Sequence, residues 1–465
     1  MTEKSWFENY SKEIQDVIKK LHIEAGQPVE VARGDKRWSG AIMPRIGGDA
    51  NALVLKLENG YNIGIEFNAN VKITKAKQVE NVAATEAKAT TKKVNLQRPT
   101  IAILHTGGTM ASRLDYRTGA VEPLVTADDL VAMYPELSEI ANIRARIIFQ
   151  MFSEDMEPEH WAAIAHEVYK EIREEGCDGV IISHGTDTMY YTASALAFML
   201  QDLPVPVILT ASQRSSDRPS SDAGFNLIAA ARFIAGSDWS GVGVCMHASS
   251  SDETCWILPA TRCRKMHSSR RDTYRPIDTK PIALIHAALN SIEMIDKNYP
   301  RKDAKRVPKL VNTVHADVGL FKVYPGMRAE QLDWYEQNCH GLLIEGYAFG
   351  QMPINKLDEL TARHPELLAK LEKIAKKIPV YVATQLPYGR INMNVYSTSR
   401  DILKAGVRPI YMQSPVAYVK LIWALGQTQD KKKVDEIMQR DVAGETYSRT
   451  ETNDFPDKAM EKTKP

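Results

Sequence analysis

An alternation of apolar runs with amphipathic helical patterns begins at residue 99. It constrains the fold of this 465-residue chain more than any other feature. The apolar runs are near-continuous, as in strands of a parallel sheet that are covered on both faces. The runs lie at Thr100–His105, Ala145–Phe149, Gly179–Ile182, Val205–Leu209, Val242–Cys245, Gly341–Ile344 and Val380–Val382. Because strands alternate with helices over about 330 residues, the sequence predicts a doubly wound α/β fold.

One stretch between two of these runs shows the helical pattern most clearly. Pro158 suits the first turn of a helix, where a missing N–H removes no intrahelical hydrogen bond. Apolar side chains then recur at the spacing that forms one helical face. These are Trp161, Ile164, Ala165, Val168 and Ile172. Gly176 ends the pattern, so we expect a helix that packs one face against the sheet.

The first 80 residues lack this pattern and predict a separate small module. Short alternating segments with turn residues between them lie at Pro28–Val31, Trp38–Ile42, Ala52–Leu55 and Tyr61–Ile65. Short strands at regular spacing favour a small β-barrel of the SH3-like kind. Residues 81–98 are rich in Ala, Thr and Lys, which predicts a linker or, alternatively, a frayed helix. Residues 431–465 predict a polar C-terminal tail.

Composition and charge exclude several classes of protein. Hydrophobic residues make up 44% of the chain, enough to bury a large core, so global disorder is excluded. The 59 basic and 58 acidic residues leave a formal net charge of +1, which argues against bulk electrostatic binding of nucleic acid or anionic membranes. The charged N-terminus has no signal-peptide segment, and no apolar run reaches the length that spans a membrane.

The cysteines indicate neither a zinc site nor a disulfide framework. Five cysteines are present, at 177, 245, 255, 263 and 339, and no pair has the CxxC spacing. Reduced structural thiols are typical of proteins in a reducing compartment. We therefore expect a cytoplasmic protein with no metal in this chain.

Residues able to act in catalysis follow the predicted strands directly. Ligands of an open parallel sheet bind beyond the carboxyl ends of its strands. Thr106–Thr109 follows the first run, Phe152–Met156 the second and Ser183–Thr188 the third. A basic stretch with six Lys/Arg and one Asp lies at 262–275. Taken singly, each segment has an ordinary interpretation. The first is a tight turn, the second a loop with a capping residue, the third a helix cap and the basic stretch a solvated charged face.

Together, these loops supply two threonines, an aspartate and at least one lysine. A threonine hydroxyl is a poor nucleophile at its free pKa and needs a nearby base. A lysine among other cations has its pKa lowered, which favours the neutral amine that a general base requires. A Lys–Asp pair coupled to a second threonine would activate the first for attack on an amide or ester carbonyl. The residues alone thus predict a covalent hydrolase with threonine chemistry, without deciding which basic residue takes part.

The same motifs resemble those of the L-asparaginase/glutaminase family. The resemblance spans roughly 99–427. Its motifs, in order, are TGGTMAS at 106–112, FSEDM at 152–156, SHGTDTMYYTA at 183–193, SDAGFNL at 221–227, RCRKMHSS at 262–269 and GLLIEGYAFGQMP at 341–353. The resemblance implies an asparaginase-like two-domain body, with a large α/β domain at 99–320 that carries the active site and a smaller α/β domain at 321–430.

The resemblance also implies roles for individual residues. Thr109 matches the nucleophile of the family's first loop. Thr186 and Asp187 match its second threonine and acidic partner, and Lys265 matches the lysine that completes the proton relay.

Four further positions are implied to bind the substrate. Gly108 shapes the oxyanion site together with Gly107. Ser153 and Glu154 match residues that grip the α-amino and α-carboxylate groups of the substrate. Tyr116 is the only tyrosine in the loop that would close over the substrate, but its spacing departs from that of free-standing asparaginases.

Two departures from free-standing asparaginases are informative, namely the additional N-terminal 98 residues and the strongly basic stretch at 262–275. Both features resemble the archaeal D-subunit family of glutamyl-tRNA(Gln) amidotransferases. That resemblance implies a homodimer that joins the amidotransferase E subunit in a heterotetramer. It implies that this chain releases ammonia from glutamine or asparagine without a cofactor. The partner would bind Glu-tRNA(Gln) and activate the glutamate with ATP and Mg²⁺.

Two alternatives stay open on the sequence. A free-standing asparaginase or glutaminase with an accessory domain would hydrolyse amides without any partner. A binding scaffold would have kept the fold and lost the chemistry, and the complete set of two threonines, aspartate and lysine argues against it.

Overall fold

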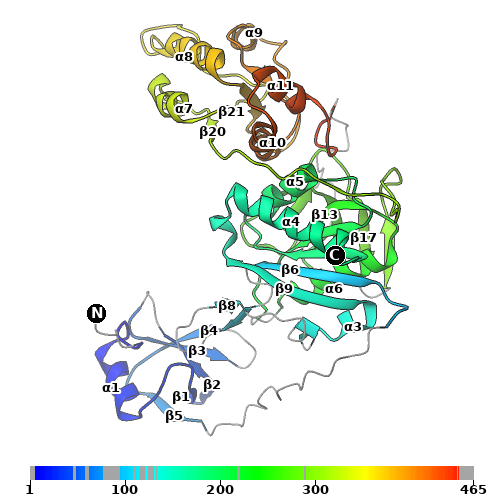
Figure 1. Ribbon diagram of the computed structural model, residues 1–465. Coiled ribbons are helices and arrows are strands. Elements are labelled where there is room, and N and C mark those ends of the chain that lie inside the picture. The colour runs from blue at the N-terminus through cyan, green and yellow to red at the C-terminus, as the bar shows by residue number, and fades with distance from the viewer. Residues whose placement is uncertain are drawn as a thin grey trace, which may run out of the picture.

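The N-terminal module is a five-stranded antiparallel sheet with one helix, drawn in blue in Figure 1. The computed structural model describes residues 6–44, 49–57, 62–76, 95–107, 112–114, 121–123, 130–131, 133–216, 220–286, 290–447 and 449. The module contains α1 (Lys12–Lys20), β1 (Pro28–Arg33), β2 (Lys36–Ile42), β3 (Ala52–Leu57), β4 (Asn62–Glu66) and β5 (Val71–Lys75), in the order β4-β3-β2-β1-β5. Ile14 and Ile18 of α1 cover the apolar face of the sheet. The sequence predicted four of these strands and missed β5. Of the predicted linker at 81–98, residues 81–94 lie outside the described residues.

The body contains an eight-stranded sheet in the order β18-β17-β14-β13-β12-β10-β6-β9. The strands are β6 (Thr100–Gly107), β9 (Asn142–Met151), β10 (Gly179–Ser183), β12 (Pro206–Thr210), β13 (Gly241–His247), β14 (Thr254–Pro259), β17 (Ala283–His286) and β18 (Ser291–Met294). From β9 to β13 the pairing is parallel, as predicted. β14, β17 and β18 are antiparallel, so the sheet is mixed.

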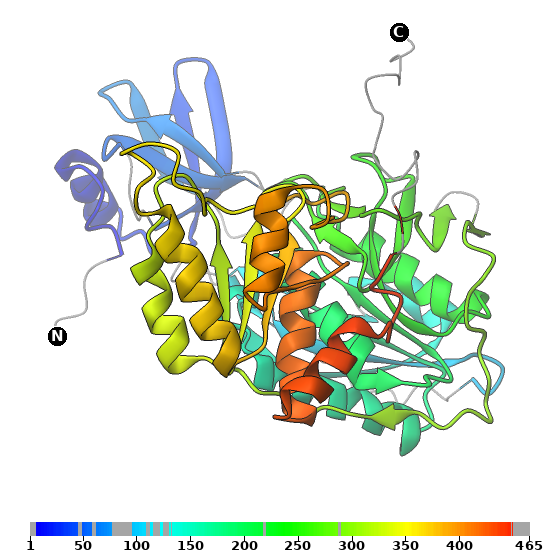
Figure 2. The same ribbon diagram turned by 90° about the horizontal axis from the view of Figure 1, so that it is seen from above.

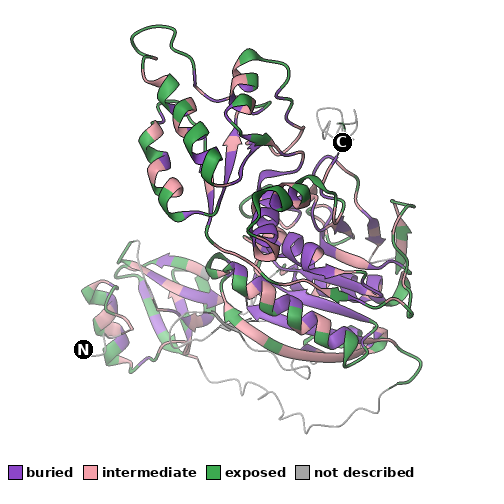
Figure 3. Cartoon of the chain, turned by 45° about the horizontal axis from the view of Figure 1, so that its top comes forward, coloured by how far each residue is buried: buried purple, intermediate pink, exposed green. Residues whose placement is uncertain are grey.

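Helices cover both faces of this sheet, as a doubly wound fold requires (Figure 1). α4 (Pro158–Arg173) and α5 (Met189–Met199) lie on one face, and α3 (Glu136–Ile140) and α6 (Ala223–Gly236) on the other. The buried face of α4 contains every apolar residue of the predicted pattern. Figure 3 shows the inner strands of the sheet buried, and the edge strand β9 and the outer faces of the helices more exposed.

The second sheet of the body has four parallel strands in the order β20-β21-β22-β23. They are β20 (Val318–Lys322), β21 (Gly341–Gly346), β22 (Val380–Thr384) and β23 (Arg408–Pro409), and the helices between them are α7 (Asp333–Asn338), α8 (His364–Lys377) and α9 (Ser397–Lys404). α10 (Ser414–Gln427) then packs against α5 and joins the two sheets into one body, as Figure 2 shows.

The prediction of a polar tail from residue 431 is wrong for its first part. Residues Lys431–Gln439 form α11, which buries Val434 and Met438 against α10. The following segment is held by Lys420 of α10, whose Nζ lies 2.5 Å from Glu445 Oε1 with both side chains fully buried. Burial lowers the pKa of Lys420 and raises that of Glu445, because each charge has lost its water. The prediction failed because the lysine-rich composition outweighed two apolar residues at helical spacing, Val434 and Met438. The ion pair of Glu445 with the distant Lys420 could not be inferred from the local sequence.

Short elements complete the described chain. They are β7 (Ser112–Leu114), β8 (Val121–Pro123), η1 (Ser153–Asp155), β11 (Leu200–Gln201), β15 (Cys263–Lys265), β16 (Tyr274–Pro276), β19 (Lys309–Leu310) and η2 (Ala329–Leu332). All five cysteines are buried free thiols. Within the described ranges, none of the helices combines the length and the apolar character needed to cross a bilayer.

Candidate active site

Three residues predicted to form a relay come together beyond the carboxyl end of β10. Thr186 and Asp187 lie in the loop between β10 and α5, and Lys265 is the last residue of β15. The Lys265 Nζ donates to Thr186 Oγ1 and to Asp187 Oδ1, each at 2.8 Å. The lysine side chain is 11% exposed and that of Asp187 is 63% exposed. The lysine side chain therefore links a buried hydroxyl to a carboxylate that is open to solvent.

A tyrosine that the sequence did not single out supports this loop. β15 and β16 form an antiparallel hairpin in which Lys265 pairs with Tyr274. The fully buried Tyr274 hydroxyl donates to the carbonyl oxygen of Thr186 at 2.7 Å. The hairpin thus brings two side chains to the same loop, one to the hydroxyl and one to the backbone. Tyr274 lies within the basic stretch, where a turn between two short runs could have been noticed. The sequence does not show that Tyr274 contacts Thr186, because that contact depends on the register between β15 and β16.

Ser153 anchors the same loop from the neighbouring element η1. Ser153 is buried, and its Oγ accepts a hydrogen bond from the Asp187 N–H at 3.3 Å. Its carbonyl oxygen accepts one from the Thr188 hydroxyl at 2.6 Å. Glu154, the other residue predicted here, is exposed at the same edge. Gly185 makes this approach possible, since a Cβ there would lie 2.7 Å from Ser153 Oγ.

The sequence also allowed Thr186 and Asp187 to cap the following helix while taking part in catalysis, and the prediction of a cap is wrong. The residue at the N-cap of α5 is Thr188, and its side chain makes no capping hydrogen bond to the helix. The Thr188 hydroxyl instead binds the Ser153 carbonyl, and Asp187 binds Lys265. The carboxylate is therefore directed toward the lysine rather than toward the orphan N–H groups of the helix.

Two buried histidines lie behind the relay and are neutral near pH 7. His184 contacts the Gly185 carbonyl oxygen at 2.8 Å and the Thr192 hydroxyl at 2.9 Å. His105, at the end of β6, contacts the Ser183 hydroxyl at 2.9 Å. Burial lowers the pKa of each histidine to about 4, because a charged imidazole would lose its hydration. Both uncharged rings therefore stabilise the ends of β6 and β10 through hydrogen bonds.

The last described residue of the first strand-end loop is Gly107. Its φ of +116° favours glycine, and a Cβ there would lie 2.1 Å from the Met151 carbonyl oxygen of β9. The backbone thus turns sharply at the predicted oxyanion site. Gly108, Thr109 and Tyr116 were predicted to follow as binding residue, nucleophile and lid residue, and they lie outside the described residues.

The basic stretch around Lys265 is largely paired within the protein. Arg270 and Arg275 both form ion pairs with Asp272, which lowers the pKa of that carboxyl group. Arg271 binds Asp252 at 2.5 Å. These pairs hold the segment after Lys265, so much of the positive charge serves to fix the loop.

Comparisons with known proteins assign the three sheets of this architecture to described families. The family of the asparaginase N-terminal domain matches residues 100–298, and the glutaminase/asparaginase C-terminal domain matches 317–438. The GatD N-terminal domain matches residues 23–75, which contain the five-stranded sheet.

Curated relatives match the chain over nearly its whole length. The D subunit of glutamyl-tRNA(Gln) amidotransferase from Pyrococcus furiosus is 42% identical over 453 residues, 95% of this chain and 97% of that protein. The same subunit from Methanothermobacter thermautotrophicus is 40% identical over 446 residues, 95% of this chain and 98% of that protein. The chain belongs to the D-subunit family of glutamyl-tRNA(Gln) amidotransferases.

Solved structures show how this member of the D-subunit family relates to asparaginases. The thermostable L-asparaginase from Thermococcus kodakarensis matches with a TM-score of 0.66 and 31% identity, over 75% of this chain and 99% of that one. L-asparaginase I from Vibrio cholerae matches with a TM-score of 0.63 and 27% identity, over 75% of this chain and 99% of that one. The asparaginase-like fold that the sequence predicted is thereby confirmed.

Proposed function

We propose that this chain is the glutaminase subunit of a tRNA-dependent amidotransferase that converts Glu-tRNA(Gln) to Gln-tRNA(Gln). The observation that carries the proposal is the pair of 2.8 Å hydrogen bonds from Lys265 Nζ to Thr186 and Asp187. A threonine hydroxyl with no role in the chemistry would not require a lysine that joins it to a carboxylate, as Lys265 joins Thr186 to Asp187. Family membership and the named relatives support the specific reaction.

The proposed chemistry is hydrolysis of a side-chain amide through an acyl-enzyme. The Thr109 hydroxyl attacks the amide carbonyl carbon of glutamine or asparagine, and backbone N–H groups at Gly107 and Gly108 stabilise the oxyanion. Lys265, Asp187 and Thr186 move the proton from the Thr109 hydroxyl to the leaving nitrogen, which departs as ammonia. A water molecule then attacks the ester, loses its proton along the same path and releases the acid, so Thr109 is regenerated.

Substrate binding is proposed at the same edge of the sheet. Ser153 and Glu154 would hold the α-amino and α-carboxylate groups, and the exposed Asp187 carboxylate would pair with the α-ammonium. Tyr116 would close over the bound amino acid. Support comes from the position of η1, which hydrogen-bonds through Ser153 to the backbone of Asp187.

We further propose a division of roles along the chain and with a partner. Residues 1–80 form the accessory module, 81–98 link it to the body and 99–320 carry the active site. The smaller domain, predicted at 321–430, begins with β20 at Val318, three residues before the predicted boundary. The chain would act in the cytoplasm as a homodimer within a heterotetramer. The E subunit would bind the tRNA and use ATP and Mg²⁺, while this chain supplies ammonia without a cofactor of its own.

The test compares ammonia release from glutamine by the purified chain alone with release in the presence of the E subunit, ATP, Mg²⁺ and Glu-tRNA(Gln). Slow release alone and a large rise with the complete set would support the coupled amidotransferase. Fast release that ignores the additions would support a free-standing amidohydrolase, the function favoured by the likeness to L-asparaginases. Absence of release in both conditions would favour a scaffold that has lost its chemistry.

A further inference from the structure

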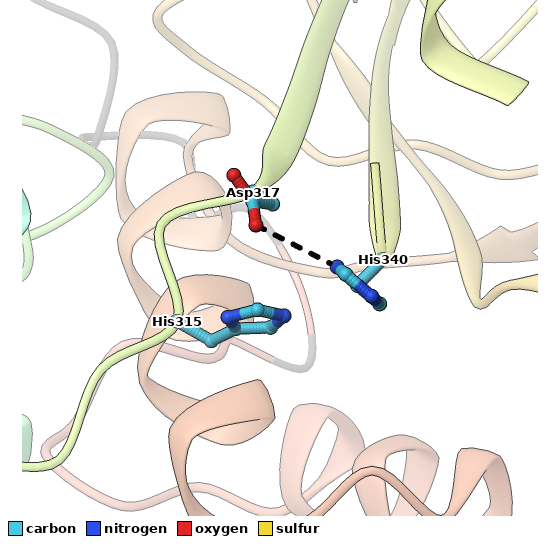
Figure 4. A group of neighbouring side chains, drawn as sticks. All are labelled: His315, Asp317 and His340. Carbon is cyan, nitrogen blue, oxygen red and sulfur yellow. Dashed lines mark ion pairs between the residues drawn. The ribbon is translucent and has the colours of Figure 1, made fainter. Parts of the chain in front are cut away.

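Three side chains that the proposed mechanism does not use converge at the amino edge of the four-stranded sheet. They are His315, Asp317 and His340, and Figure 4 shows them directed toward a common point. One donor atom from each lies within 4.8 Å of the donors of the other two. We propose that these three residues form a binding site for a divalent transition-metal ion of the zinc class.

The strand register explains why two of these residues meet. β20 pairs in parallel with β21, and Val318 stands opposite Gly341. Asp317 and His340 directly precede these two residues, so they stand side by side. The His340 N–H donates to the Asp317 carbonyl oxygen at 2.8 Å, which extends the ladder by one bond.

His315 reaches the same point from the segment that connects the two sheets. It lies two residues before Asp317, and its N–H donates to the Ile422 carbonyl oxygen of α10 at 3.1 Å. The imidazole rings of His315 and His340 have their centroids 4.4 Å apart at an interplanar angle of 47°. Each of the three backbone positions is therefore fixed by a hydrogen bond.

One pair of donor atoms is already near the spacing of a metal site, and all three donors lie within 4.8 Å of one another. Asp317 Oδ2 lies 3.8 Å from His340 Nδ1. In a tetrahedral zinc site with bonds of about 2.0–2.1 Å, neighbouring ligand atoms lie about 3.3 Å apart. The Asp317 and His340 side chains are 62% and 54% exposed, so small rotations can close the gap and an ion can enter from solvent.

The two imidazoles and the carboxylate determine which metal ions this site would bind. Imidazole nitrogens suit Zn²⁺, Ni²⁺, Co²⁺ and Cu²⁺, whereas Mg²⁺ and Ca²⁺ prefer oxygen ligands. Two histidines and one carboxylate leave at least one coordination position for water. A bound ion would tie the segment after β19 to the starts of β20 and β21. The sequence predicted no metal in this chain, because cysteine spacings cannot reveal two distant histidines and an aspartate.

The test is isothermal titration of Zn²⁺ into the full-length chain, purified without a histidine tag and stripped with EDTA. We expect one equivalent to bind. His340→Ala and Asp317→Asn should each weaken binding at least about tenfold. His166→Ala, which removes an exposed histidine from α4, is the matched control and should leave the affinity unchanged. Co²⁺ should give visible d–d bands that His340→Ala abolishes.

Because Asp317 and His340 are exposed, their variants should fold. Asp317→Asn preserves the shape of the side chain in any case. The proposal is overturned if the unmodified chain binds no zinc at sub-millimolar concentration. It is equally overturned if the two cluster variants bind zinc as the unmodified chain does, or if His166→Ala weakens binding to the same extent.

Discussion

The carboxyl edge of the eight-stranded sheet and the amino edge of the four-stranded sheet both gather polar side chains, in opposite ways. At the first edge, Thr186 and His184 are buried, Lys265 is 11% exposed, and each is hydrogen-bonded to another protein group. The Asp187 carboxylate at this edge is open to solvent but is held by Lys265. At the second, Asp317 and His340 are exposed, and Asp317 Oδ2 lies 3.8 Å from His340 Nδ1.

The difference separates a site that the protein has assembled from a site that needs a ligand to complete it. Enclosed polar groups are costly unless each is paired, so their partners are fixed by the fold and any substitution disturbs several bonds. Exposed donors are satisfied by water and can be exchanged at little cost to stability. Substitutions at the two edges should therefore differ in the size of their effects and in the property of the protein that they alter.

The largest effect is expected at Lys265. Lys265→Met removes the amine between Thr186 and Asp187 while keeping the apolar stem. Ammonia release from glutamine should fall at least about 10³-fold, within the range that general acid–base groups contribute. The control is Lys280→Met, which replaces an exposed lysine of the same domain and should keep full activity. Retention of activity in the Lys265 variant, measured as kcat with folding verified, would exclude the relay.

The second effect concerns acid stability at the enclosed edge. The pKa of buried His184 is lowered to about 4, against about 6.5 for an unfolded histidine. Above pH 6.5 the ring is neutral in both states. As the pH falls from 6.5 to 4 the unfolded chain takes up the proton first, so the free energy of unfolding should fall by about 2–3 kcal/mol.

Denaturant unfolding at pH 7 and pH 4 measures this loss. His105 contributes in the same direction and the same pH window, because its pKa is also lowered to about 4. His184→Gln should make the acid-dependent loss smaller. An identical loss in the variant and the unmodified chain would mean that His184 does not carry it.

A third effect tests the close approach of η1 to the relay loop. In Gly185→Ala the new methyl group would lie 2.7 Å from Ser153 Oγ, so the serine must move. We expect a loss of about 1–3 kcal/mol in the free energy of unfolding and a higher KM for glutamine. Gly64→Ala is the control, since its methyl group would meet only Ala52 Cβ at 3.8 Å. Equal stability of the two variants would contradict the packing described for Ser153.

The smallest effect is expected at the exposed edge. Without metal, Asp317→Asn should change the free energy of unfolding by no more than about 0.5 kcal/mol. With zinc present, the unmodified chain should gain thermal stability by mass action and the variant should gain less. A large loss on substitution in EDTA would show that the protein itself depends on this carboxylate, and the contrast between the two edges would fail.

The sequence predicted the enclosed parts of the fold better than the edges. β6, β10 and β12 are buried on both faces, and their unbroken apolar runs indicate this directly. β17 and β18 were missed because they have only four residues each and are partly buried, and β14 was missed because buried and half-buried residues are mixed along it, so it forms no unbroken apolar run. α11 was taken for tail because its burial depends on α10, which no local pattern reveals.

The same limit applies to the candidate site. Thr186 and Asp187 could be selected because they follow a strand directly. Charge alone did not distinguish Lys265 from its basic neighbours, and the resemblance to a family was needed to choose it. Tyr274 depends on the hairpin register, and the meeting of His315 with His340 depends on the order of two parallel strands. Such contacts are set by tertiary structure, which the local sequence does not specify.

Transfer of nitrogen from amide-labelled glutamine to Glu-tRNA(Gln) would test the role of this chain as an ammonia source. The assay contains this chain or its Lys265→Met variant, together with the E subunit, ATP and Mg²⁺. We predict labelled Gln-tRNA(Gln) with the unmodified chain, none with the variant, and restored product when ammonium salt is added to the variant. Labelled product from the variant would refute the role of Lys265. Absence of product from the unmodified chain, with ammonium still used, would refute its role as the ammonia source.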